Sequence, residues 1–205
     1  MSEQSPLQSS VNVFVEWAKA RLDEMAANAG TLQANLDQLD ATARAQAEQA
    51  IAQLNQWIAK GQSDIKDVQA QGEAAVAKAK ADMETLWAQF QTDSEKWAAL
   101  AQDQHATFQA RAQAQVKAWQ DAVNGYMQRL NDVHEQNKAQ VEAQVEQFKA
   151  EAQKAQTDLN TKVEELSKAG QASWTAMNQA LDQSRDAFTK SLETASKSFD
   201  DALKG

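Results

Sequence analysis

The chain has 205 residues, a net charge of −9 and no cysteine. The negative charge argues against a nucleic-acid-binding protein, which would carry a basic face, and the missing cysteines exclude disulfides and thiolate chemistry. The N-terminal sequence lacks a secretory signal and no run approaches the roughly 20 apolar residues of a membrane-spanning helix, so we expect a cytoplasmic protein, free or associated with the surface of a granule or membrane.

The composition predicts helices throughout. The sequence contains one proline and six glycines, and Ala, Gln, Lys and Glu, which are good helix formers, dominate it. Alanine supplies about half of the 42% hydrophobic residues, so large side chains are too few for a thick core. We therefore predict an all-α fold of long amphipathic helices, either elongated or folded back as a thin helical bundle or coiled coil.

The first 30 residues form a distinct apolar helical segment. Its apolar face consists of Val11, Phe14, Val15, Trp17, Leu22 and Met25. Gly30 can close a helix and Thr31 can cap the next one, so we place a break there and divide the chain into residues 1–30 and 31–205. The first segment could dock on the rest of the chain, mediate oligomerisation or anchor the protein to a surface.

From residue 32 to residue 203, apolar residues recur every eleven positions. The series is clearest at Leu86, Trp97, Phe108, Trp119 and Leu130, and most members have an apolar companion three or four residues later, on the same helix face. We name these residues the apolar stripe and expect them to bind a surface or a partner. Its members are Leu54, Ile65, Val76, Leu86, Trp87, Phe90, Trp97, Phe108, Trp119, Val123, Leu130, Val141, Val145, Val163, Trp174, Met177, Leu181, Phe188, Leu192 and Phe199.

The period of the stripe indicates nearly straight helices. Eleven residues in three turns give about 3.67 residues per turn, close to the 3.6 of a relaxed helix. The phase continues unchanged across Gly61, Gly72, Gly125 and Gly170. Because a loop would usually shift the phase, we predict that most of these glycines lie inside helices.

The sequence contains no recognisable catalytic, cofactor or metal site. His105 and His134 are the only histidines, and the positions three residues before them hold Gln102 and Asn131 rather than the Glu of a di-iron motif. A phosphate-binding loop and a nucleophile elbow are also missing. We therefore predict a protein that is not an enzyme and that binds no cofactor or metal.

The six tryptophans allow two interpretations. Indole rings are favoured at interfaces between an apolar phase and water, but they also fill cores between helices. The sequence alone leaves both roles open.

The eleven-residue amphipathic period resembles the helices of exchangeable apolipoproteins and lipid-droplet coat proteins. The chain's size, acidity, missing cysteine and apolar segment Val11-Asn-Val-Phe-Val-Glu-Trp17 also resemble bacterial phasins, which coat polyester storage granules. This resemblance implies a non-catalytic protein that coats a polyester granule, a lipid droplet or a membrane through its apolar stripe. The alternative is a self-assembling homo-oligomeric rod, a coiled coil with right-handed packing.

Overall fold

The described residues of the chain fold into six α-helices. The computed structural model describes residues 6–100, 104–133, 135–168 and 174–204. Its helices are α1 (Pro6–Asn35), α2 (Ala41–Gln71), α3 (Glu73–Leu100), α4 (Gln104–Arg129), α5 (Glu135–Lys168) and α6 (Trp174–Lys204), and short 3₁₀ turns, η1 (Leu36–Gln38) and η2 (Leu130–Asp132), follow α1 and α4. The predicted all-α class is confirmed.

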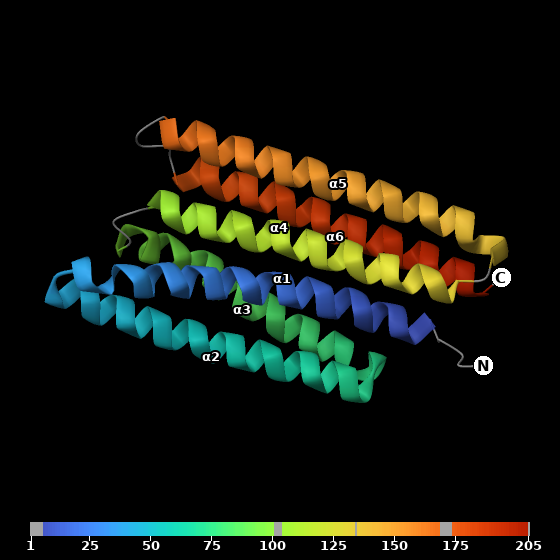
Figure 1. Cartoon of the computed structure of the whole chain (residues 1–205). Helices are drawn as coiled ribbons and strands as arrows, with labels where there is room; N and C mark the ends of the chain where they lie inside the picture. Colours follow the sequence, from blue (N-terminus) through green and yellow to red (C-terminus); the bar gives the residue numbers. More distant parts are fainter. Residues whose placement is uncertain (1–5, 101–103, 134, 169–173, 205) are drawn as a thin grey trace.

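The helices run alternately up and down along one common direction (Figure 1). Helices α1, α2 and α3 contact one another and make the N-terminal half, and α4, α5 and α6 likewise make the C-terminal half. The chain is therefore folded back on itself, as the predicted bundle requires. The individual helices are 26 to 34 residues long, and the eleven-residue repeat does not run along one continuous helix.

Helix α1 is the element that joins the two halves. It packs against α2 and α3 on one side and against α4 and α6 on the other. Of the roles considered for the N-terminal segment, the structure shows docking on the rest of the chain. The predicted break at Gly30–Thr31 is wrong, because α1 continues to Asn35. A Cβ atom added at Gly30 would meet nothing within 4 Å, so this glycine interrupts neither the helix nor its packing.

The first change of direction follows η1, and the same local geometry recurs in the second half. The Leu39 amide donates to the Leu36 carbonyl at 3.3 Å, and the Val133 amide donates to the Leu130 carbonyl at the same distance. Leu39 and Val133 both have extended backbones. After η1, the Asp40 carboxylate caps α2 by accepting hydrogen bonds from the next helix's first amides. Each half thus begins with a long helix, a 3₁₀ turn and a return helix.

The glycines divide into three groups. Gly61 and Gly125 lie inside α2 and α4, as predicted. Gly72 does not: it ends α2 with a φ of 70°, a conformation that favours glycine, and α3 begins at the next residue. Gly170 lies outside the described residues.

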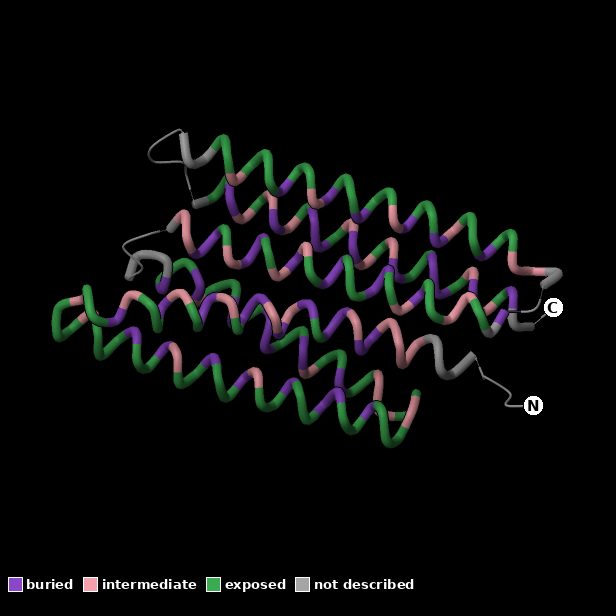
Figure 2. Tube along the Cα trace, in the orientation of Figure 1, coloured by how far each residue is buried: buried purple, intermediate pink, exposed green. Residues whose placement is uncertain are grey.

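Buried and exposed residues separate cleanly along the helices (Figure 2). Each helix turns its apolar positions inward and its polar positions outward, which is the pattern of an amphipathic bundle. Among the side chains that the structure describes, Met127 is the only large hydrophobic residue that is exposed, at 44%. The outside of the part of the chain that the structure describes therefore offers no extended apolar face.

Candidate functional site

The apolar stripe lies in the interior of the bundle. Three of its members, Val76, Leu130 and Val163, are half-buried, and the side chain of Trp174 lies outside the described residues. The buried members are Leu54, Ile65, Leu86, Trp87, Phe90, Trp97, Phe108, Trp119, Val123, Val141, Val145, Met177, Leu181, Phe188, Leu192 and Phe199. The sequence pattern identified the inward-facing positions, and the folded chain itself covers them.

The N-terminal apolar face is also covered. Val11 is half-buried, and the remaining members of the face are buried: Phe14, Val15, Trp17, Leu22 and Met25. Trp17 lies 5.9 Å from Phe14, measured between ring centroids. All five tryptophans with described side chains are buried, which is the core-filling role, and Trp119 contacts both Phe148 and Phe188.

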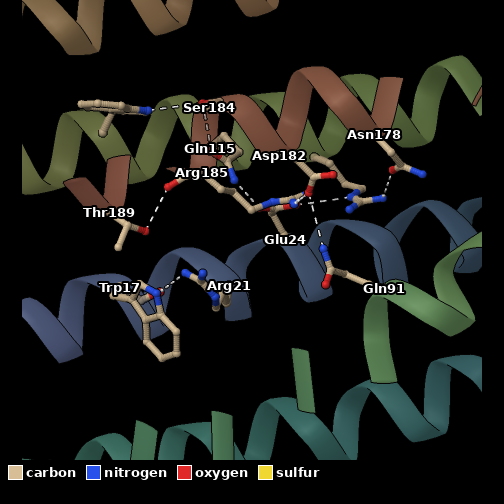
Figure 3. A network of polar contacts seen from close by, with 12 residues as sticks. Trp17, Arg21, Glu24, Gln91, Gln115, Asn178, Asp182, Ser184, Arg185 and Thr189 are labelled. Atoms are coloured by element: carbon tan, nitrogen blue, oxygen red, sulfur yellow. Dashed lines mark hydrogen bonds and ion pairs between the residues drawn. The ribbon is translucent and has the colours of Figure 1, made fainter. Parts of the chain in front are cut away.

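A cluster of charged and polar side chains crosses the interior between the halves (Figure 3). Its centre is Glu24 of α1, which is fully buried. Its carboxylate accepts a hydrogen bond from Arg185 Nε of α6 at 2.9 Å, and Arg111 Nε of α4 lies 3.4 Å from it. The side-chain amide of Gln115 also donates to it. One acidic side chain from the N-terminal half thus binds three side chains of the C-terminal half.

Further hydrogen bonds and an ion pair orient the side chains that surround Glu24. Gln115 accepts a hydrogen bond from Ser184, whose hydroxyl in turn accepts one from the Trp119 indole N–H at 3.4 Å. Arg111 donates to Asn178 at 3.2 Å, and Arg185 pairs with Asp182. We name the whole set the Glu24 cluster: Glu24, Arg111, Gln115, Asn178, Asp182, Ser184 and Arg185.

Aromatic rings of the N-terminal half cover both arginines. The Arg111 guanidinium carbon lies 5.1 Å from the centre of the Phe90 ring, and that of Arg185 lies 4.9 Å from Trp87. Both rings belong to α3. Cation–π contacts of this kind are more favourable when they are shielded from water, and Arg111 and Arg185 are only 1% and 5% exposed.

Burial lowers the pKa of two arginines in and beside the cluster, Arg21 and Arg111. It lowers the pKa of Arg21, which stacks on Trp17 one helical turn before Glu24, to about 10. Burial also lowers the pKa of Arg111, while the Glu24 carboxylate acts in the opposite direction. The cluster therefore holds charged groups that are costly to remove from water.

Two donors near the cluster remain without a hydrogen-bond partner in the part of the chain that the structure describes. They are Arg21 Nε and the side-chain nitrogen of Asn28, which is 1% exposed. A buried donor without an acceptor costs about 1–3 kcal/mol relative to the same group in water. Separation of the halves would return such groups to water.

The interface between the halves is also incompletely filled at one end. A cleft of about 550 Å³ lies between α1, α3 and α6. Its lining includes Val13, Phe14 and Trp17 of α1, Val76 of α3, and Thr189 and Ser196 of α6. The two halves are thus held together by an interface that contains charges at its centre and a cleft at one end.

The described residues offer no group of three or more His, Asp or Glu side chains that could hold a metal ion. His105 Nε2 lies 3.3 Å from the Val163 carbonyl oxygen, and His134 lies outside the described residues. Sequence reasoning missed the Glu24 cluster. Its signal was the spacing of Arg111 and Arg185, each three residues from a stripe phenylalanine, Phe108 and Phe188.

Comparison of the chain with protein-family models, curated proteins and solved structures found no match. Within the described residues, no helix combines the length and apolarity needed to cross a membrane. The features of this chain that bear on its function are therefore its fold, the apolar stripe and the Glu24 cluster.

Proposed function

We propose that the protein is a non-catalytic amphipathic helical protein that coats an apolar surface, such as a polyester granule, a lipid droplet or a membrane. It does so by opening its bundle and laying the inner faces of its helices on that surface. The observation that carries this proposal is the contrast between the two sides of the helices. Large apolar side chains line the inside, whereas Met127 is the one large hydrophobic residue exposed among the described side chains.

This contrast fits a protein with two environments. A closed bundle covers its apolar stripe and stays dispersed in water, because its outer surface is polar. An apolar surface can replace the opposite helices as the partner of the stripe, since the hydrophobic contribution depends on the area removed from water and not on the partner's identity. The core is also rich in alanine, including Ala18, Ala47 and Ala122, so less apolar contact is lost on opening.

The test is adsorption to a neutral-lipid emulsion whose acyl chains carry bromine, which quenches tryptophan fluorescence on contact. In buffer the emission should be blue-shifted, because the described tryptophan side chains are buried. With emulsion, the protein should float with the particles to saturation, keep its helix content and lose emission through quenching. An emulsion without bromine controls for scattering. Protein that stays in the aqueous fraction at every emulsion concentration would exclude surface coating.

A self-assembling rod remains the second candidate predicted from the sequence. It requires a fixed oligomer in the absence of any surface, which sedimentation velocity measures directly. Changing Trp97, Phe108 and Trp119 together to Gln is a poor test of either candidate, because all three side chains are at most 7% exposed. The substitutions would disrupt the bundle itself.

A further inference from the structure

We propose that the Glu24 cluster is a releasable latch of the closed bundle: its ion pairs fix how the two halves meet while adding little net stability, so that the halves can separate while each keeps its three helices. This inference rests on the proposed surface-coating function, because it specifies how that function is controlled. The contacts that form the latch are those of three side chains, Glu24, Arg111 and Arg185.

Buried ion pairs cross the interface between the halves. Glu24 belongs to α1, and its partners Arg111 and Arg185 belong to α4 and α6. The same arginines lie over Phe90 and Trp87 of α3. Both arginines of the Glu24 cluster are therefore inserted among acidic and aromatic groups of the N-terminal half, as Figure 3 shows for Arg185 and Glu24.

Each half has packing of its own that does not involve the cluster. Helix α2 packs on α1 and α3 of the N-terminal half, and α5 packs on α4 and α6 of the C-terminal half. The C-terminal half also contains a separate apolar cluster, formed by Phe108, Ala112, Leu159, Met177 and Leu181. The main apolar core is shared by the two halves, so their separation uncovers apolar side chains of both.

Charges make this interface separable. Buried ion pairs contribute little net stability, because the cost of removing both charges from water offsets their attraction, whereas apolar residues of similar volume often stabilise the same site. On separation, the carboxylate and the guanidinium groups regain water. With the pairs intact the interface is closed and specific, and with one partner removed it opens, because uncompensated buried charge remains.

Engineered thiols can measure the opening, because the chain contains no cysteine. Ala122 is 1% exposed and shares a face of α4 with Arg111 and Gln115, eleven and seven residues before it, so Ala122→Cys probes the interface between the halves. Ala50 of α2 is 3% exposed, and Ala50→Cys probes the interior of the N-terminal half. The rate of reaction with a soluble thiol reagent then reports how often each site opens.

Three backgrounds test the latch. Glu24→Gln should accelerate labelling of Ala122→Cys by about a hundredfold or more, because two buried arginines lose the Glu24 carboxylate and Arg185 keeps only Asp182, and should leave Ala50→Cys nearly unchanged. The triple variant Glu24→Leu, Arg111→Met, Arg185→Leu should slow labelling of Ala122→Cys by about fivefold or more. The matched control is Asp82→Asn, which removes the 3.0 Å ion pair between Lys60 and Asp82 inside the N-terminal half and should not change labelling at Ala122→Cys.

The outcomes are separable. Equal acceleration of labelling at both thiols in Glu24→Gln would mean that the whole chain unfolds. A triple variant labelled at the wild-type rate would mean that the cluster does not limit opening. These two results together overturn the proposal. If Glu24→Gln fails to fold, the triple variant alone decides, since it must slow the labelling of Ala122→Cys.

The emulsion separates this proposal from the function on which it rests. If both hold, the triple variant adsorbs at least about fivefold more slowly than the wild-type chain, in proportion to its slower labelling. If the wild-type chain never adsorbs but the labelling rates of the variants change as described, the latch stands and the coating function is excluded. Adsorption at the same rate in all variants keeps the coating function and excludes the latch.

Discussion

Gly61 of α2 lies directly against Leu22 of α1. A Cβ atom on Gly61 would lie 2.6 Å from the Leu22 Cδ2 atom and 2.7 Å from the Met83 Cε atom of α3. Three helices of the N-terminal half therefore approach one another at a position where only hydrogen fits. Leu22 and Met83 are themselves buried, so they can make room for a Cβ atom only by shifting within the core.

Gly61→Ala should lower the free energy of unfolding by up to about 2 kcal/mol. Overpacking of a core costs about 1–3 kcal/mol, and the better helix propensity of alanine offsets about 1 kcal/mol of it. Urea denaturation followed by circular dichroism measures the difference. The matched control is Gly30→Ala, which meets no atom within 4 Å and should raise the free energy of unfolding by about 1 kcal/mol. Equal stabilisation by both substitutions would contradict the close packing at Gly61.

Gly72→Ala should destabilise the turn between α2 and α3. Gly72 has φ 70° and ψ −148°, a region open essentially to glycine alone, so a side chain there costs about 1–3 kcal/mol. The same denaturation experiment applies. Gly125→Ala is the control, because Gly125 lies inside α4 with open space around it and should tolerate alanine. A wild-type midpoint for Gly72→Ala would show that the turn has a different conformation.

Asp40→Ala should remove about 1 kcal/mol from the free energy of unfolding. The Asp40 carboxylate accepts hydrogen bonds from the Thr42 and Ala43 amides, both at 2.9 Å, and no other side chain caps α2. Loss of an N-cap costs typically about 1 kcal/mol. Asp40→Asn keeps an oxygen acceptor at this position and should remain close to wild type. A loss of the same size in both variants would point to the charge of Asp40 rather than to its hydrogen bonds.

The single tyrosine should titrate late. Burial raises the pKa of the Tyr126 phenol from 10.0 to about 12, and its hydroxyl donates to the Leu192 carbonyl oxygen at 3.3 Å. Absorbance of the phenolate at long ultraviolet wavelengths should therefore rise with a midpoint near pH 12 in the folded chain and near pH 10 in denaturant. A folded midpoint near 10 would contradict the burial of the phenol.

The raised pKa of Tyr126 also makes the free energy of unfolding fall as the pH rises. Because the folded pKa lies above the unfolded one, the contribution of Tyr126 is fully present below about pH 10 and is lost as the pH rises towards 12. Tyr126→Phe removes this part of the pH dependence and abolishes the absorbance change. A wild-type chain whose loss of stability between pH 10 and 12 equals that of Tyr126→Phe would exclude the linkage.

Sequence reasoning predicted the helices and their inward faces well, because both follow from local propensity and from a period near 3.6. Leu54 and Phe108, placed on the stripe by spacing alone, are fully buried. The turns were harder to locate. Ile65 and Val76 are eleven residues apart, yet Gly72 ends a helix between them. A turn this short lets both helices face the same core, so the apolar phase survives a reversal of direction.

The Glu24 cluster could not be predicted because its members meet only in the tertiary structure. Glu24, Arg111 and Arg185 come from three helices, and although the spacing of the two arginines places them near the apolar stripe, nothing in the sequence pairs them with Glu24. Exposed ion pairs such as Lys78–Asp82 are of the local kind that a sequence does reveal, with partners one turn apart. The pairing of helices α1, α4 and α6 depends instead on how the two halves pack against each other.

Glu24 and Arg185 are separated by 161 residues, and this separation sets an order of events during synthesis. At about 5–20 residues per second, Arg185 leaves the ribosome roughly 10–30 s after Glu24. Throughout that interval the α1 face that later meets α4 and α6 lacks part of its cover, although the N-terminal half can already assemble. A ribosome-bound chain arrested before Trp174 should therefore bind a hydrophobic dye that the released protein does not bind. A nascent chain with so long an uncovered period is a natural client for chaperones at the exit tunnel.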